Sequence, residues 1–142
     1  MFKKILVPTD SSEYSSRALH QALELAQLSG AEILLLHVTF TPEALGYALS
    51  NGIAVLQDQL ELDGEQALAA TLAGVNPSGQ VKVRKKQRPG HPAVVILEEV
   101  ELENVDLIVM GSRGYGPMAG SVLGSVSQRV VQKASCPVLI VK

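Results

Sequence analysis

The chain has 142 residues, of which 46% are hydrophobic and 18% are charged. A chain of this length can bury one substantial core, so we expect a single domain over residues 1–142. Its apolar fraction excludes intrinsic disorder. The 12 basic and 14 acidic side chains give a net charge of −2, far from the basic balance of nucleic-acid-binding domains. Nucleic acid is therefore not an expected partner.

The cysteine content and the N-terminus predict where the protein works. Cys136 is the one cysteine, which excludes an intramolecular disulfide and suits a reducing compartment. The first apolar run stops at Pro8 and Asp10, so it is too short for a secretory signal. No apolar run approaches the roughly 18 residues of a membrane span. We expect a cytoplasmic protein without a membrane partner.

The first part of the chain has the pattern of a strand, a helix and a second strand. Residues 3–7 form an apolar run typical of a strand that is buried on both faces. From Glu13, apolar residues recur at three- and four-residue steps as far as Gly30, which predicts a helix with a glycine C-cap. Residues 31–38 form a second apolar run. The two strands should be parallel and joined by a right-handed crossover.

The middle of the chain predicts a helix and an edge strand. Residues 39–76 contain no further apolar strand, but their apolar residues keep a helical spacing from Ile53 to Leu72, after a lid-like segment at 41–57. Residues 80–87 alternate valines with Lys82, Arg84 and Lys86, which favours a solvated edge strand protected by charge. A nucleic-acid patch is the less favoured interpretation, because no aromatic residue lies among these charges.

The last third predicts two more helices and two more strands. Pro92 is placed to start a helix through Val100, with its acidic face toward solvent. Residues 105–110 and 138–141 have the pattern of strands, and residues 126–134 that of a helix. Strands that alternate with helices imply a parallel sheet covered on both faces. Ligands of such sheets bind beyond the carboxyl ends of the strands.

The loop after the fourth predicted strand is rich in glycine. Five glycines occur within fourteen residues, at positions 111, 114, 116, 120 and 124. A glycine-rich stretch that ends at a helix N-terminus offers backbone N–H groups and the positive helix end, which together suit phosphate. Ser125 and Ser127 can add hydroxyl donors, and Arg113 a charge-assisted hydrogen bond. The alternative is that the loop only turns tightly and Ser125 caps the helix.

The loop after the first predicted strand contributes a carboxylate. Asp10 would repel phosphates, but it could accept a hydrogen bond from a ribose hydroxyl or an adenine amino group. Asp10 and Glu13 also have the spacing of a capping box, so Asp10 could serve only as a helix cap. The residues alone leave both interpretations open.

Common nucleotide and catalytic motifs do not fit the chain. The dinucleotide fingerprint lacks the acidic residue that should hold the ribose, and neither loop contains the Gly-Lys-Ser/Thr of a P-loop. No Ser-His-Asp arrangement or convincing general base for hydrolysis is legible. We therefore assign no catalytic residue and no protein-held metal.

Five segments of the chain resemble the universal stress proteins, and they cover nearly its whole length. They read KKILVPTDSSEYSSRAL, AEILLLHV, GHPAVVIL, VDLIVMGSRG and SCPVLIVK. The most specific motif is the family's nucleotide-binding signature, in which two glycines separated by two residues are followed, nine residues later, by Gly-Ser or Gly-Thr. Here Gly111, Gly114, Gly124 and Ser125 complete it. The chain is thus similar to the ATP-binding branch of the family.

The resemblance implies a doubly wound, Rossmann-like α/β domain with five parallel strands in the order 3-2-1-4-5 and helices on both faces. It also implies that Asp10 contacts the ribose or base and that Pro8 and Val38 line the adenine. The residues implied to bind the nucleotide are Pro8, Thr9, Asp10, Val38, Met110, Gly111, Arg113, Gly114, Gly124, Ser125, Val126 and Ser127. The last four would cradle the phosphates.

By the same resemblance we expect a stress-response or regulatory protein that binds ATP, or ADP or AMP, with slow or no hydrolysis. Mg²⁺ or Mn²⁺ could accompany the nucleotide, held by phosphates and water. The alternatives are a slow ATPase or nucleotidyl-transfer enzyme of similar fold, and an interaction module that holds no nucleotide. The apolar C-terminal strand at 138–141 would pair with a second copy to give a homodimer.

Overall fold

The computed structural model describes residues 1–39, 53–75, 79–114 and 123–142, with the backbone alone for 53–60. Its elements are β1 (Lys4–Thr9), α1 (Glu13–Ser29), β2 (Glu32–Thr39), α3 (Ile53–Ala73), β3 (Val83–Pro89), α4 (Pro92–Leu102), β4 (Leu107–Gly111), α5 (Ser125–Lys133) and β5 (Val138–Val141). All strand pairs are parallel, and the sheet order is β3-β2-β1-β4-β5. The predicted fold class and strand order are confirmed.

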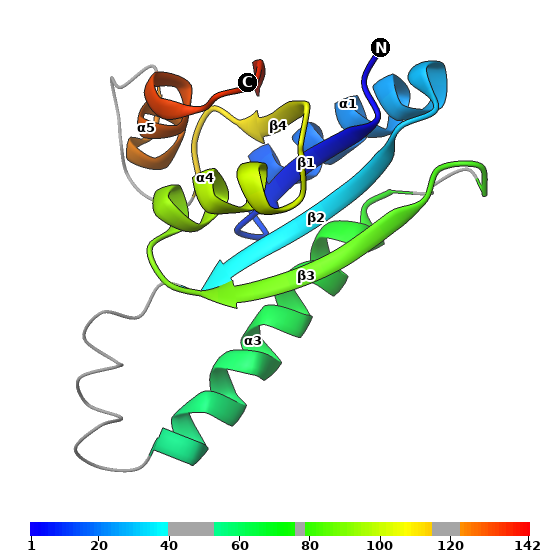
Figure 1. The fold of residues 1–142 in the computed structure, drawn as a ribbon. Helices are drawn as coiled ribbons and strands as arrows, with labels where there is room; N and C mark the ends of the chain where they lie inside the picture. The colour runs from blue at the N-terminus through cyan, green and yellow to red at the C-terminus, as the bar shows by residue number, and fades with distance from the viewer. Residues whose placement is uncertain (40–52, 76–78, 115–122) are drawn as a thin grey trace.

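The strands divide their side chains between two cores, because successive residues of a strand point to opposite faces of a sheet. Ile5 and Val7 of β1 belong to the core that α1 and α3 cover. Leu6, which lies between them, belongs to the core that α4 and α5 cover. Figure 1 shows α1 and α3 behind the sheet and α4 and α5 in front of it. These three β1 residues are fully buried, which explains their uninterrupted apolar run.

Helix α1 begins and ends with local signals that the sequence carries. Ser12 is its N-cap, and the Ser12 side chain accepts a hydrogen bond from the backbone N–H of Ser15 at 3.3 Å. At the other end Gly30 adopts the left-handed conformation with φ of 76°, which a residue without a side chain reaches at no steric cost. The predicted C-cap is therefore confirmed.

Helix α3 crosses the sheet at close range. It contacts β2 and β3, and a Cβ atom added to Gly64 would collide with the side-chain amide of Gln87. Within the described part of the chain, neither α3 nor another helix is long and apolar enough to cross a bilayer. The lid-like segment predicted at 41–57 lies outside the described residues, apart from the backbone of the first turn of α3.

The predicted edge strand is confirmed, because β3 ends the sheet. Its Arg84, Lys86 and Arg88 are not simply solvated, since they pair with glutamates at α4. The acidic side of α4 therefore faces solvent only in part. Glu99 of α4 has no exposed surface and contacts Lys86 at 3.1 Å and Arg88 at 2.9 Å. Glu103 accepts a hydrogen bond from Arg84 at 2.7 Å and contacts Lys4 at 3.4 Å. The physical reason is that α4 packs across this face of the sheet, where a buried carboxylate needs opposite charges as partners.

The pairing of Glu103 predicts how the stability of the fold depends on pH. Its hydrogen bond from Arg84 lowers the pKa of the Glu103 carboxyl from 4.5 to about 2. Because the folded-state pKa lies below that of the unfolded chain, this stabilisation is present above pH 4.5 and is lost as the pH falls toward 2. We expect Glu103→Gln to lower the free energy of unfolding by about 1 kcal/mol at pH 7 and by less at pH 3.

Urea unfolding at both pH values measures this difference. Glu98→Gln is the matched control, because the substitution removes the same charge from α4. The Glu98 side chain lies beside Arg88 but is 49% exposed. The effect of Glu98→Gln should stay within a few tenths of a kcal/mol. An equal loss in the Glu103 and Glu98 variants, or a Glu103 effect that does not change with pH, would contradict the assignment.

Candidate functional site

A cavity opens where the carboxyl ends of β1 and β4 lie side by side. At this point the strand order reverses direction, which is where open α/β sheets place their ligands. The volume of the cavity is about 250 Å³, close to the lower end of the range for small-molecule sites. Its lining residues are Pro8, Thr9, Asp10, Ser15, Leu36, Val38, Pro92, Ile96, Met110, Gly111, Arg113, Gly114, Gly124, Ser125, Val126 and Ser127.

The structure brings all twelve residues of the predicted site to this one cavity. They come from the end of β1 and the turn after it, the end of β2, the end of β4 and the segment after it, and the start of α5. Their contacts with a ligand stay predictions. Sequence reasoning missed four lining residues, Ser15, Leu36, Pro92 and Ile96. The spacing carried a signal for three of them, since Leu36 precedes Val38 by two strand positions, and Pro92 and Ile96 are one helical turn apart.

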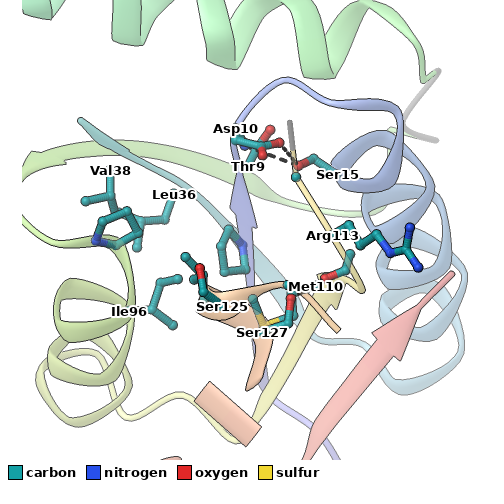
Figure 2. Close-up of a pocket in the computed structure, with 16 residues that line it drawn as sticks. Thr9, Asp10, Ser15, Leu36, Val38, Ile96, Met110, Arg113, Ser125 and Ser127 are labelled. Atoms are coloured by element: carbon teal, nitrogen blue, oxygen red, sulfur yellow. Dashed lines mark hydrogen bonds between the residues drawn. The ribbon is translucent and has the colours of Figure 1, made fainter. Parts of the chain in front are cut away.

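The cavity has an apolar end and a polar end. Figure 2 shows Leu36, Val38 and Ile96 together on one side and Asp10, Ser15 and Arg113 on the other. Ser125 and Ser127, at the start of α5, lie between these two groups. A ligand that fills the cavity therefore needs a flat or apolar part and a part that accepts hydrogen bonds.

The first turn of α5 faces this cavity without a side-chain cap. Its N-cap is Gly124, which has no side chain with which to accept from the amides that follow. The alternative in which Ser125 caps the helix is therefore wrong, because Ser125 is already the first helical residue. The first N–H groups of a helix have no partner within the helix. They give this end of the cavity a partial positive charge.

Two polar side chains of the predicted site are directed elsewhere. Ser127 Oγ donates to the carbonyl oxygen of Gly111 at 2.9 Å or to that of Ser112 at 3.2 Å, so its single proton stays within the loop. The guanidinium of Arg113 points away from Ser125 and Ser127 in Figure 2. The donors that the start of α5 offers to a ligand are therefore its backbone amides and the hydroxyl of Ser125, rather than the expected Ser127 hydroxyl.

Asp10 is fixed by α1 but does not cap it. Its Oδ1 accepts hydrogen bonds from the backbone N–H of Ser12 at 2.9 Å and from Ser15 Oγ at 2.7 Å. The N-cap of α1 is Ser12, so the capping-box interpretation of Asp10 is wrong. The carboxylate instead orders the turn between β1 and α1, where it lines the cavity.

Two glycines let the segment after β4 approach the start of α1. A Cβ atom on Gly111 would lie 2.6 Å from Tyr14 Cβ and 2.9 Å from the Tyr14 carbonyl carbon. A Cβ atom on Gly114 would collide with Oδ2 of Asp10. Gly124 differs, because a Cβ atom there would meet nothing closer than Arg113 Cα at 3.5 Å, which is ordinary contact. The backbone packing of α1 requires Gly111, the position of the Asp10 carboxylate requires Gly114, and neither requires Gly124.

The described residues offer no protein-held metal site. Across 1–39, 53–75, 79–114 and 123–142 there is no group of three or more His, Cys, Asp or Glu side chains that could hold an ion. Among the residues that the structure describes, Asp10 is the one carboxylate that lines the cavity. A divalent cation at this site would therefore depend on oxygen atoms that a ligand brings with it.

Fold and site together define an α/β protein with a ligand cavity at the switch point of a parallel sheet. The model of the universal stress protein family matches residues 1–142, and the chain belongs to this family. It is 38% identical to a universal stress protein of Thermus aquaticus, over 100% of both chains.

Two solved structures of the same family share the fold. UspA from Lactobacillus plantarum superposes with a TM-score of 0.82 at 25% identity, covering 99% of this chain and 98% of that one. A universal stress protein solved in complex with cAMP has a TM-score of 0.66 at 26% identity and covers 99% and 96%.

The contrast between the glycines predicts opposite effects on stability. Gly111→Ala should lower the free energy of unfolding by about 1–3 kcal/mol, because the new methyl group forces the backbone of α1 to move. Gly124→Asn should leave it unchanged or raise it by a few tenths of a kcal/mol, since asparagine is a favoured N-cap. Urea unfolding of both variants is the measurement. Equal losses would show that Gly124 also serves the fold.

Proposed function

We propose that this protein binds an adenine nucleotide in the cavity, with ATP as the main ligand, and acts as a stress-associated regulator with slow or no hydrolysis. The observation that carries the proposal is the glycine N-cap of α5 at the polar end of the cavity. A serine or aspartate there would satisfy the helix amides and stabilise the helix. Glycine at this position suits an anion that takes the place of the cap.

The apolar end fits the base of such a nucleotide. Leu36, Val38 and Ile96 line it, and apolar side chains of this kind pack against the faces of an aromatic ring. Asp10 lies across the cavity from the apolar side chains, where a carboxylate can accept a hydrogen bond from a ribose hydroxyl. The family member solved with cAMP supports an adenine nucleotide as the ligand class.

The lining residues favour binding over turnover. Hydrolysis needs a general base within hydrogen-bond reach of the attacking water. Asp10 is the one carboxylate among the described residues of the cavity wall, and its Oδ1 is held by Ser12 and Ser15 at the turn into α1. Mg²⁺ or Mn²⁺ would be bound by phosphate oxygens and water. We therefore infer that the nucleotide is a bound signal rather than a substrate in rapid turnover.

Identification of the bound nucleotide tests the proposal directly. The purified protein is denatured, the released small molecules are separated, and any nucleotide is identified by mass. Calorimetry then compares the binding of ATP with that of adenosine, which has the base and ribose but no phosphate. We expect wild-type protein to release an adenine nucleotide and to bind ATP at least tenfold more tightly than adenosine.

Gly124→Asp is the matched variant for this measurement. Aspartate keeps a good N-cap but places a negative charge where the phosphates are expected, so ATP binding should be lost and adenosine binding kept. Gly124→Asn has nearly the same shape without the charge, and it should weaken ATP binding less. If the Gly124→Asp protein bound ATP as tightly as wild type does, the proposal would be refuted.

We also propose that the protein forms a homodimer through β5. This strand is an edge of the sheet, and its residues Val138, Leu139, Ile140 and Val141 carry no charge. Leu139 is 38% exposed, so this apolar edge is open to a partner strand. Edge strands of this composition pair readily with a second copy, and a twofold axis closes the contact.

A single added charge tests the dimer. Leu139→Lys places an ammonium group on the proposed contact and should shift the protein from dimer to monomer in sedimentation at micromolar concentration. Leu28→Lys is the control, because Leu28 lies on α1 and is 86% exposed, so the same charge is added away from β5. Wild-type protein that sediments as a monomer, or a Leu28→Lys variant that dissociates equally, would refute the β5 contact.

A further inference from the structure

We propose that Ser15, on the first turn of α1, is the residue that positions Asp10 for nucleotide binding; this inference rests on the proposed function. Ser15 lines the cavity and is 5% exposed. It is joined to Asp10 by two hydrogen bonds in opposite directions. The backbone N–H of Asp10 donates to Ser15 Oγ at 3.1 Å, and Ser15 Oγ donates to Oδ1 of Asp10 at 2.7 Å.

The direction of these hydrogen bonds follows from the single hydroxyl proton of Ser15. Because that proton goes to Asp10, the 3.2 Å contact between the hydroxyls of Ser12 and Ser15 must have Ser12 as the donor. A chain of hydrogen bonds thus runs from Ser12 through Ser15 to the carboxylate. Each donor in such a chain polarises the next, which strengthens the hydrogen bond that reaches the charged group.

These hydrogen bonds fix the positions of the two carboxylate oxygens of Asp10. Oδ1 is held by Ser12 N–H and Ser15 Oγ on the side of α1. The carboxylate plane is then set so that Oδ2 lies against Gly114, where a Cβ atom would collide with it. Gly114 also lines the cavity. Ser15 therefore holds the carboxylate in one orientation before a ligand arrives, which reduces the entropy lost on binding.

A double-mutant cycle separates positioning from a general effect on the helix. Ser15→Ala should weaken ATP binding about three- to tenfold in calorimetry, because the Asp10 carboxylate loses a donor and rotates. In an Asp10→Ala background the same change should alter the ATP affinity less than twofold, since nothing is left to position. Ser16→Ala, one residue further along α1, is the matched control and should bind ATP as wild type does.

A measurement on ligand-free protein tests the role of Ser15 independently of whether the protein binds a nucleotide. In a crystal structure of ligand-free Ser15→Ala protein, we expect the Asp10 carboxylate to leave the backbone N–H of Ser12. An unmoved carboxylate would overturn the inference, as would a loss of ATP affinity that is equal in both backgrounds. Wild-type protein that binds no adenine nucleotide would instead remove the proposed function, while the crystal structure would still decide whether Ser15 holds Asp10.

Discussion

The site depends on a close approach between the C-terminal end of β4, with the residues that follow it, and the start of α1, with the turn that precedes it. Tyr14 packs on Gly111 at a distance that leaves no room for a Cβ atom, and the Asp10 carboxylate packs on Gly114 in the same way. These contacts join two segments about a hundred residues apart in sequence. The two walls of the cavity are therefore positioned by packing of main chain against side chain, which is stiffer than a contact between two long side chains.

The N-terminus of α5 lacks the stabilising side-chain cap that its backbone could accommodate. Most helices gain about 1 kcal/mol from a capping side chain, and α1 has this gain from Ser12. At α5 the N-cap is Gly124, although its backbone φ of −69° and the space around it would admit another residue. A functional site that is less stable than its fold permits is the common outcome where a ligand takes over the role of a side chain.

The sequence predicted the sheet because alternation and helical period are local properties. The apolar run of β1 and the glycine that ends α1 could be read directly, and the strand order followed from the family resemblance. The pairing of Glu99 with Lys86 and Arg88 could not be read, because it depends on how α4 crosses β3. Ser15 was missed for a similar reason. Its hydroxyl contributes to the cavity only once the turn at Asp10 brings the two residues together.

Helix α4 connects the charged network to the cavity. Pro92, Ile96 and Glu99 of α4 follow one another at steps of three and four residues and form one stripe of the helix, which the C-cap residue Glu103 continues. The N-terminal half of the stripe lines the cavity, and the C-terminal half is held by Arg84, Lys86 and Arg88 of β3. Ile96 itself is 2% exposed and packs in the core below.

The same helix is held against the sheet by its apolar residues in the core and by the ion pairs of Glu99 with Lys86 and Arg88. The partly buried ion pairs of α4 are thus part of the architecture of the site, even though none of their charged groups lines it.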